Sequence, residues 1–133
     1  MPPLFADLGA ALRAHDYDKA NEVLPASSIM SVPPESADRV RSMVQGNTRL
    51  WTIPYSLVRQ LSPPATERLE TIRTPALVLV GENDLEAVRS QGRLLGQRLA
   101  DARLVTIAGG GHLLNLTSPD AFREAVTAFL GLS

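Results

Sequence analysis

The chain of 133 residues contains no cysteine. Disulfide bonds, cysteine-ligated zinc sites and a cysteine nucleophile are therefore excluded as the basis of its fold or its chemistry. Its charges nearly cancel, because 13 basic and 14 acidic residues leave a net charge of −1. No global electrostatic field would draw nucleic acid or an anionic membrane to such a chain, so we expect no nucleic-acid partner.

Long hydrophobic runs are also absent. None approaches the roughly 20 apolar residues that a helix needs to span a bilayer, and the first residues, MPPLFAD, do not combine a basic region with an apolar core as a secretory signal does. We therefore expect no membrane partner and a soluble protein of the cytoplasm. The hydrophobic share of 44% and the charged share of 20% are typical of an ordered globular domain.

The distribution of proline separates two parts of the chain. Eight of the ten prolines precede Glu70 and divide that part into short segments. Apolar spacing and proline or glycine boundaries predict helices at about residues 4–12, 16–24 and 34–46, with a weaker one at 54–61. In the third of these, Val40, Met43 and Val44 are expected to share one apolar face. The first 70 residues therefore read as a series of short helices.

The pattern changes after Leu69. Residues 76–80, ALVLV, form an uninterrupted apolar run, which is typical of a strand buried on both faces in a parallel sheet. A second strand is predicted at 103–107, a helix at 86–100 lies between them, and a further helix starts at Pro119. Gly92 should let the first of these helices approach the sheet closely. The alternation predicts an α/β fold with parallel strands and right-handed connections.

Two strands of this kind do not make a stable parallel sheet alone, because each expects neighbours and cover on both faces. The sequence therefore looks like part of a larger sheet. A strand edge without a neighbour leaves backbone donors and acceptors unpaired, and such an edge favours self-association.

The residues that could carry chemistry follow the two predicted strands. The turn Gly-Glu-Asn-Asp ends at Asp84, and the run Gly-Gly-Gly-His ends at His112. The carboxyl ends of parallel strands meet at one edge of a sheet, so these side chains can meet in space. An Asp bonded to one imidazole nitrogen leaves the other nitrogen free as a base, which is the supporting half of a nucleophile–His–acid triad. No Gly-Lys-Ser or Gly-Lys-Thr follows the glycines, so a phosphate loop is not expected.

Residues 72–84, IRTPALVLVGEND, and 102–122, ARLVTIAGGGHLLNLTSPDAF, resemble the segments that carry the triad acid and histidine in the α/β-hydrolase superfamily. The nearest resemblance is to small-ester and lactone hydrolases of the 3-oxoadipate enol-lactonase type. It implies that Asp84 is the catalytic acid and His112 the general base, acting on a small ester or lactone without a cofactor or metal. It also implies a helical cap-like region at 1–70, followed by the C-terminal β-α-β-α part of the hydrolase core at 71–133.

Under such a cap, Trp51 and Tyr55 are candidates for lining the substrate pocket, and packing between the cap helices is the other interpretation.

The chain departs from the family pattern at the nucleophile. The family's nucleophile occupies a Gly-x-Ser-x-Gly elbow ahead of the acid, and none of the ten serines here has those flanking glycines. The oxyanion loop near the first strands is missing too. We therefore expect a fragment of a hydrolase that is inactive alone, whose nucleophile, Ser or Asp, lies elsewhere or was lost. The alternatives are an inactive interaction or structural module and, less compatible with the strands, a tetratricopeptide-like scaffold suggested by residues 16–20.

Overall fold

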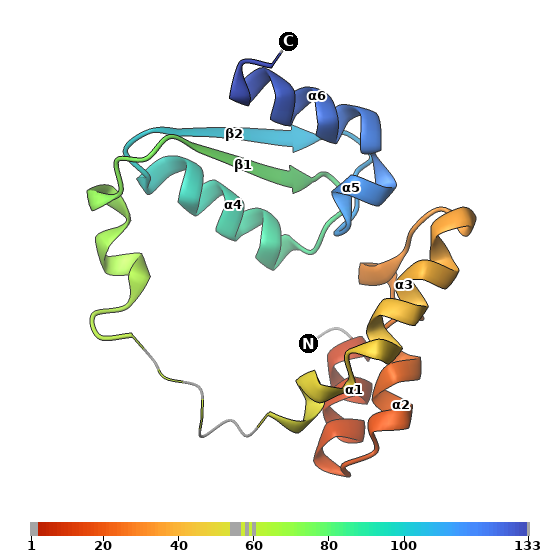
Figure 1. Cartoon of the computed structure of the whole chain (residues 1–133). Helices are drawn as coiled ribbons and strands as arrows, with labels where there is room; N and C mark the ends of the chain where they lie inside the picture. The colour runs from red at the N-terminus through yellow and green to blue at the C-terminus, as the bar shows by residue number, and fades with distance from the viewer. Residues whose placement is uncertain (1–2, 54–56, 58, 60, 133) are drawn as a thin grey trace. The chain divides into compact units, whose positions relative to one another are not determined.

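The computed structural model describes residues 3–53, 57, 59 and 61–132 of the chain (Figure 1). The chain forms two compact units, Met1–Val58 and Arg59–Ser133, each of which is described by itself. Within the described residues, no helix has both the length and the apolarity that crossing a membrane requires.

The first unit consists of short helices. They are α1 (Pro3–Arg13), α2 (Tyr17–Val23), the 3₁₀ turn η1 (Ser28–Met30), α3 (Pro34–Gly46) and the 3₁₀ turn η2 (Thr48–Thr52). The side chain of Asp16 caps α2 by accepting the N–H of Lys19 at 2.9 Å. The three predicted helices at 4–12, 16–24 and 34–46 are thus confirmed. The weaker stretch predicted at 54–61 lies largely outside the described residues.

The core of the first unit is small. Ala11, Ala20 and Val40 are buried, and α1 packs against α2. Val40, Met43 and Val44 all lie within the continuous helix α3, where their spacing places them on one face, yet 57% of the surface of Met43 is exposed. Helix α3 makes few contacts with the other described elements, and Val40 is the residue of α3 that is buried.

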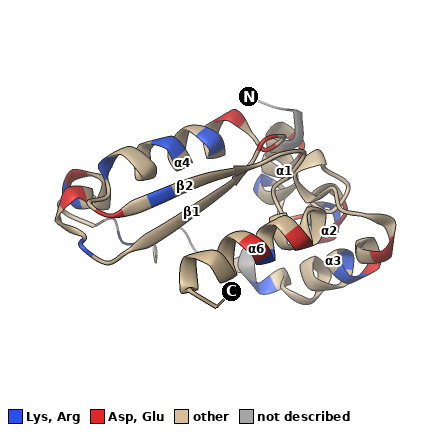
Figure 2. Cartoon of the chain, turned by 90° about the horizontal axis from the view of Figure 1, so that it is seen from above, with Lys and Arg blue, Asp and Glu red and all other residues tan. Residues whose placement is uncertain are grey.

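The second unit contains the strands. Its elements are the 3₁₀ segment η4 (Ala65–Thr71), β1 (Ala76–Gly81), α4 (Glu86–Arg98), β2 (Ala102–Ile107), α5 (Leu114–Thr117) and α6 (Pro119–Leu130). The two strands pair in parallel, from Ala76 opposite Ala102 to Gly81 opposite Ile107. Helices α4 and α6 lie on opposite faces of this sheet, as Figures 1 and 2 show from two directions. The predicted parallel strands with flanking helices are therefore confirmed.

Helix α4 approaches the sheet closely, as Gly92 predicts. Gly92 is buried, and a Cβ atom there would collide with the side chain of Val80. A Cβ atom on Gly96 would lie 3.0 Å from Cβ of Leu104. Two small residues on one stripe of α4 thus bring its backbone onto the face that presents Val80 and Leu104.

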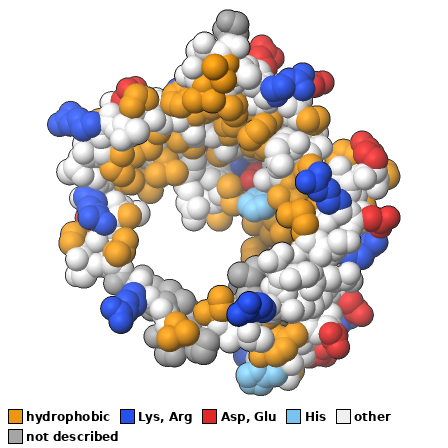
Figure 3. Space-filling model, in the orientation of Figure 1, with side chains coloured by type: hydrophobic (Ala, Val, Ile, Leu, Met, Phe, Trp, Pro, Cys, Tyr) orange, Lys and Arg blue, Asp and Glu red, His pale blue; other side chains and the backbone are white. Residues whose placement is uncertain are grey.

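The sheet of the second unit is only partly covered. Leu77, Val78 and Leu79 are half-buried, while Leu104 is 37% exposed, and hydrophobic side chains reach the surface of this unit in Figure 3. The described residues supply no third strand. The apolar run of β1 is therefore less buried than its composition leads one to expect, because among the described residues it pairs with β2 alone.

The amides of β1 that point toward its free edge can be identified. The N–H of Ala76 donates to the carbonyl of Asp101 at 2.9 Å, and the N–H of Glu82 donates to Ile107 at 3.0 Å. Amides along a strand point alternately to its two sides. The amides of Leu77 and Leu79 consequently point away from β2, toward the free edge.

Candidate active site

A tight turn after β1 places Asp84. The N–H of Glu82 extends the ladder by one bond to Ile107, and the N–H of Asp84 then donates to the carbonyl of Gly81 at 3.2 Å. Oδ1 of Asp84 accepts the N–H of Leu85, the residue before α4, at 2.7 Å. The side chain of Asp84 is only 5% exposed. The turn therefore holds a carboxylate in a sheltered position at the carboxyl end of the sheet.

The glycine loop after β2 passes directly over the end of β1. A Cβ atom on Gly81 would collide with the carbonyl groups of Gly110 and Gly111. Gly109 has a φ of +67°, in the left-handed region that favours glycine. The N–H of Gly111 donates to Oγ1 of Thr117 at 3.2 Å. The absence of side chains thus lets the two loops approach backbone to backbone.

Asp84 and His112 meet as the sequence predicts. Nδ1 of His112 lies 2.9 Å from Oδ1 and 3.1 Å from Oδ2 of Asp84. The histidine side chain is 37% exposed. With a proton on Nδ1 donated to the carboxylate, Nε2 is left unprotonated, which is the form that a general base requires. No described residue makes a hydrogen bond to Nε2. The catalytic roles of both residues stay predictions.

Three hydrogen bonds join the loop after β1 that carries Asp84 (the acid loop, residues 82–85) to the glycine loop after β2 that carries His112 (the histidine loop, residues 108–113). The N–H of Gly109 donates to Oε2 of Glu82 at 2.8 Å. The backbone N–H of Asn83 donates to the carbonyl of Gly110 at 2.9 Å, and its side-chain amide donates to the carbonyl of Gly109 at 3.3 Å. Sequence reasoning did not single out Glu82, although an acidic residue in the same turn as Asp84 was a signal for it.

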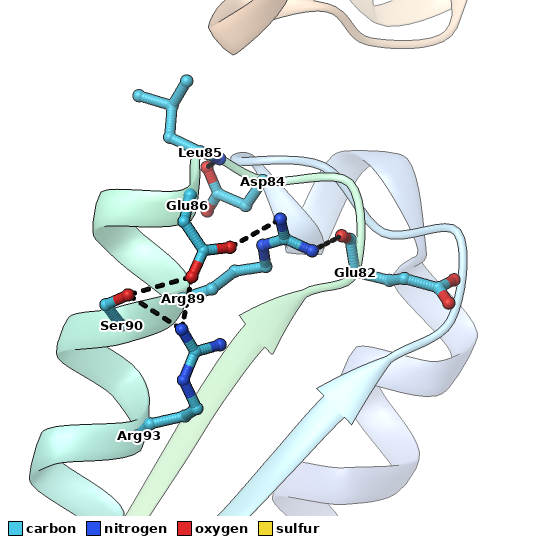
Figure 4. A network of polar contacts seen from close by, with 7 residues as sticks. All are labelled: Glu82, Asp84, Leu85, Glu86, Arg89, Ser90 and Arg93. Atoms are coloured by element: carbon cyan, nitrogen blue, oxygen red, sulfur yellow. Dashed lines mark hydrogen bonds and ion pairs between the residues drawn. The ribbon is translucent and has the colours of Figure 1, made fainter.

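Arg89 connects the acid loop to α4 (Figure 4). Its guanidinium donates to the carbonyl of Glu82 at 2.9 Å and pairs with Glu86 at 2.7 Å. Glu86 also accepts hydrogen bonds from Arg93 and Ser90. The pKa of Glu86 is lowered, most by the hydrogen bond from Arg93 and next by the one from Ser90. The first turn of α4 and the loop that carries Asp84 are thus joined by one polar network.

The two candidate pocket residues fall in the first unit. Nε1 of Trp51, in η2, donates to Oδ1 of the buried Asn21 at 2.8 Å. Asn21 lines a cavity of about 600 Å³ between α2 and α3, and Trp51 is not among its lining residues. This bond supports the packing interpretation of Trp51, whose role in substrate binding stays a prediction. Tyr55 lies outside the described residues.

A metal centre is not formed by the part of the chain that the structure describes, where no group of three His, Asp or Glu side chains could hold an ion.

Comparison with known proteins identifies the class. The model of the alpha/beta hydrolase family matches residues 1–125. The chain belongs to this family, and the predicted fold class is confirmed.

Three similar proteins show how much of a longer protein the chain spans. It is 28% identical to a crystal structure of a hydrolase from Pseudomonas aeruginosa PA01, with a TM-score of 0.71, over 97% of this chain and 49% of that one. It is 44% identical over 64 residues to RutD, a proposed carbamate hydrolase of Caulobacter sp. (strain K31), covering 48% of this chain and 24% of RutD. It is 41% identical over 66 residues to the polyketide synthase ThaQ of Burkholderia thailandensis, a match that covers 50% of this chain and 3% of ThaQ. The chain thus spans about half of the solved hydrolase, and its match spans about a quarter of RutD.

Proposed function

We propose that Asp84 and His112 are the acid and the general base of a catalytic triad in an α/β-hydrolase. The observation that carries this proposal is the 2.9 Å contact between Nδ1 of His112 and Oδ1 of a sheltered Asp84. This contact orients the imidazole and stabilises the imidazolium that forms when Nε2 takes a proton. The exposed ring of His112 leaves Nε2 accessible to a nucleophile and a substrate.

The proposed substrate is a small ester or lactone. This follows from the resemblance of the acid and histidine segments to small-ester and lactone hydrolases. The similarity to RutD adds carbamates to the compounds worth testing, because esters, lactones and carbamates all present a carbonyl carbon to a nucleophile. No cofactor or metal is part of the proposal.

The proposed nucleophile, Ser or Asp, lies on a polypeptide segment outside residues 1–133. Two observations support this. None of the ten serines has the context of the elbow, and no described residue bonds to Nε2 of His112. The helices before the strands are proposed to act as a cap for the substrate. By this proposal the 133 residues alone are a partial enzyme.

The experiment joins the missing segment to this chain. A reading frame upstream of the gene is searched for a Gly-x-Ser-x-Gly elbow, and both segments are produced together and tested on activated short-chain esters, lactones and carbamates. We expect turnover by the assembled protein and none above buffer by the 133-residue chain, since His112 alone has no hydroxyl to deprotonate. His112→Ala should lower kcat of the assembled protein by at least about 10³-fold.

His15→Ala is the matched control, because His15 is exposed and, among the described residues, its side chain hydrogen-bonds only to Tyr17. It should keep full activity. Turnover by the 133-residue chain that His112→Ala abolishes would place the nucleophile within these residues. An assembled protein without activity on any of the three classes would favour the alternative, an inactive interaction module.

The free edge of β1 supports a second proposal, which is that the 133-residue chain self-associates. Sedimentation should show concentration-dependent association, and hydrogen exchange at the amides of Leu77 and Leu79 should slow as the concentration rises. The amide of Ala76 is already bonded to Asp101 and serves as the internal control. A compact monomer with slow exchange at all three amides would contradict this proposal.

A further inference from the structure

We propose that Glu82 is a positioning residue of the Asp84–His112 pair, acting through its carboxylate on the glycine loop. The proposal rests on the proposed function in one respect, because it takes this pair as the acting groups. Glu82 makes no hydrogen bond to either side chain of the pair. It acts on His112 through the backbone of Gly109, which lies 27 positions away from it in the sequence.

The loop before His112 needs an external anchor. Gly109, Gly110 and Gly111 are consecutive, and glycine has more backbone freedom to lose on ordering than any other residue. Gly109 is moreover held at a φ of +67°. A loop of this composition would sample many conformations, and most of them would carry His112 away from Asp84.

The carboxylate of Glu82 provides that anchor. It accepts the N–H of Gly109 at 2.8 Å. A hydrogen bond to an ionised acceptor is stronger than one between neutral groups. The carbonyl of Gly109 also accepts the side-chain amide of Asn83, at the longer distance of 3.3 Å, and Gly110 is bonded to Asn83 and Ile107. The bond to Glu82 is the one that the backbone N–H of Gly109 makes.

The backbone of Glu82 is itself hydrogen-bonded on two sides, and these bonds fix the position from which its carboxylate extends. Its N–H donates to Ile107 at 3.0 Å, and its carbonyl accepts from Arg89 at 2.9 Å. Figure 4 shows the Glu82 side chain extending away from Arg89, toward the loop that follows β2. The guanidinium of Arg89 pairs instead with Glu86 at 2.7 Å, so the carboxylate of Glu82 remains available to Gly109.

The test measures the geometry and does not depend on turnover. In the full 133-residue chain labelled with ¹⁵N, NMR reports the exchange rate of the Gly109 amide and, from the ring nitrogen shifts, the tautomer of neutral His112. Glu82→Ala should speed exchange at Gly109 about tenfold, as expected for the loss of one hydrogen bond. It should also turn a predominantly Nδ1–H histidine into a mixture of tautomers.

Two variants make the comparison specific. Glu82→Gln keeps a side-chain oxygen that can accept the N–H of Gly109, so it should restore the Nδ1–H tautomer and most of the protection. Asp120→Asn removes the same charge from an exposed site on α6 and should change neither readout. Glu82→Ala could unfold the sheet, which would be seen as a loss of the β1 and β2 amide signals. In that case Glu82→Gln tests the inference: its strands should stay intact while exchange at Gly109 rises a fewfold.

Asp84→Asn separates this inference from the proposed function. If Asp84→Asn alters the tautomer and Glu82→Ala leaves both readouts unchanged, the inference about Glu82 is overturned and the pair stands. If Asp84→Asn leaves the tautomer unchanged, the proposed pair itself fails. Unchanged exchange at Gly109 in both Glu82 variants also overturns the inference.

Discussion

Asp84→Asn is expected to lower kcat of the assembled hydrolase by about 10⁴-fold, the loss found when the acid of a Ser-His-Asp triad becomes an amide. Asparagine has nearly the shape of aspartate but carries an NH₂ group and no charge. It can direct that group at Nδ1 of His112, which favours the tautomer with the proton on Nε2. The nitrogen that should accept a proton is then blocked, and the imidazolium loses its counter-charge.

The substitution should leave the fold intact, which makes the kinetic loss interpretable. The carbonyl oxygen of an asparagine can still accept the N–H of Leu85, as Oδ1 of Asp84 does at 2.7 Å. The measurement is kcat and KM on an activated ester, and the loss should fall on kcat. Asp120→Asn, the same chemical change on exposed α6, is the control. A loss in Asp84→Asn of less than about tenfold would contradict the role of this carboxylate in the triad.

Gly81→Ala is expected to disrupt the second unit at the carboxyl end of its sheet. The added Cβ atom would collide with the carbonyl groups of Gly110 and Gly111, which are backbone atoms and cannot swing aside. The histidine loop would have to leave the end of β1, breaking its bonds to Glu82 and Asn83. We expect the free energy of unfolding to fall by about 3 kcal/mol, the upper part of the range for overpacking.

Hydrogen exchange of the β1 and β2 amides measures this loss, because it reports on the second unit alone. Gly46→Ala is the matched control, since a Cβ atom there meets no other atom within 4 Å. That substitution lies at the end of α3, in the first unit, and should leave exchange of the β1 and β2 amides unchanged. An unfolding free energy for Gly81→Ala within about 0.5 kcal/mol of the parent would show that the loop can yield without cost.

The candidate site could be predicted from the sequence because its two residues follow strong local signals. The run ALVLV ends at Gly81, and the turn after it contains Asp84, while His112 follows the second strand and its glycines. Parallel strands present their carboxyl ends at the same edge of the sheet, so two turns far apart in the sequence had to be neighbours. The 2.9 Å contact is the geometric result of that rule.

Other features depended on contacts that no local pattern encodes. The apolar spacing of α3 places Met43 beside Val40, yet only Val40 is buried, because burial requires a neighbouring element and α3 has few. Likewise, Trp51 is compatible with a pocket or with packing, and its bond to Asn21 appears only once segments 30 positions apart are brought together.

The sequence by itself determined the α/β class of the fold, the order of strands and helices, and the two residues that meet at the sheet end, because periodicity and turn composition act over a few neighbouring residues. The tertiary structure alone decided how that meeting is secured: Glu82 reaches Gly109, Arg89 holds the carbonyl of Glu82, and Gly81 admits the backbone of Gly110. These contacts join groups that become neighbours only after β1 and β2 have paired, so their partners cannot be read from either segment alone.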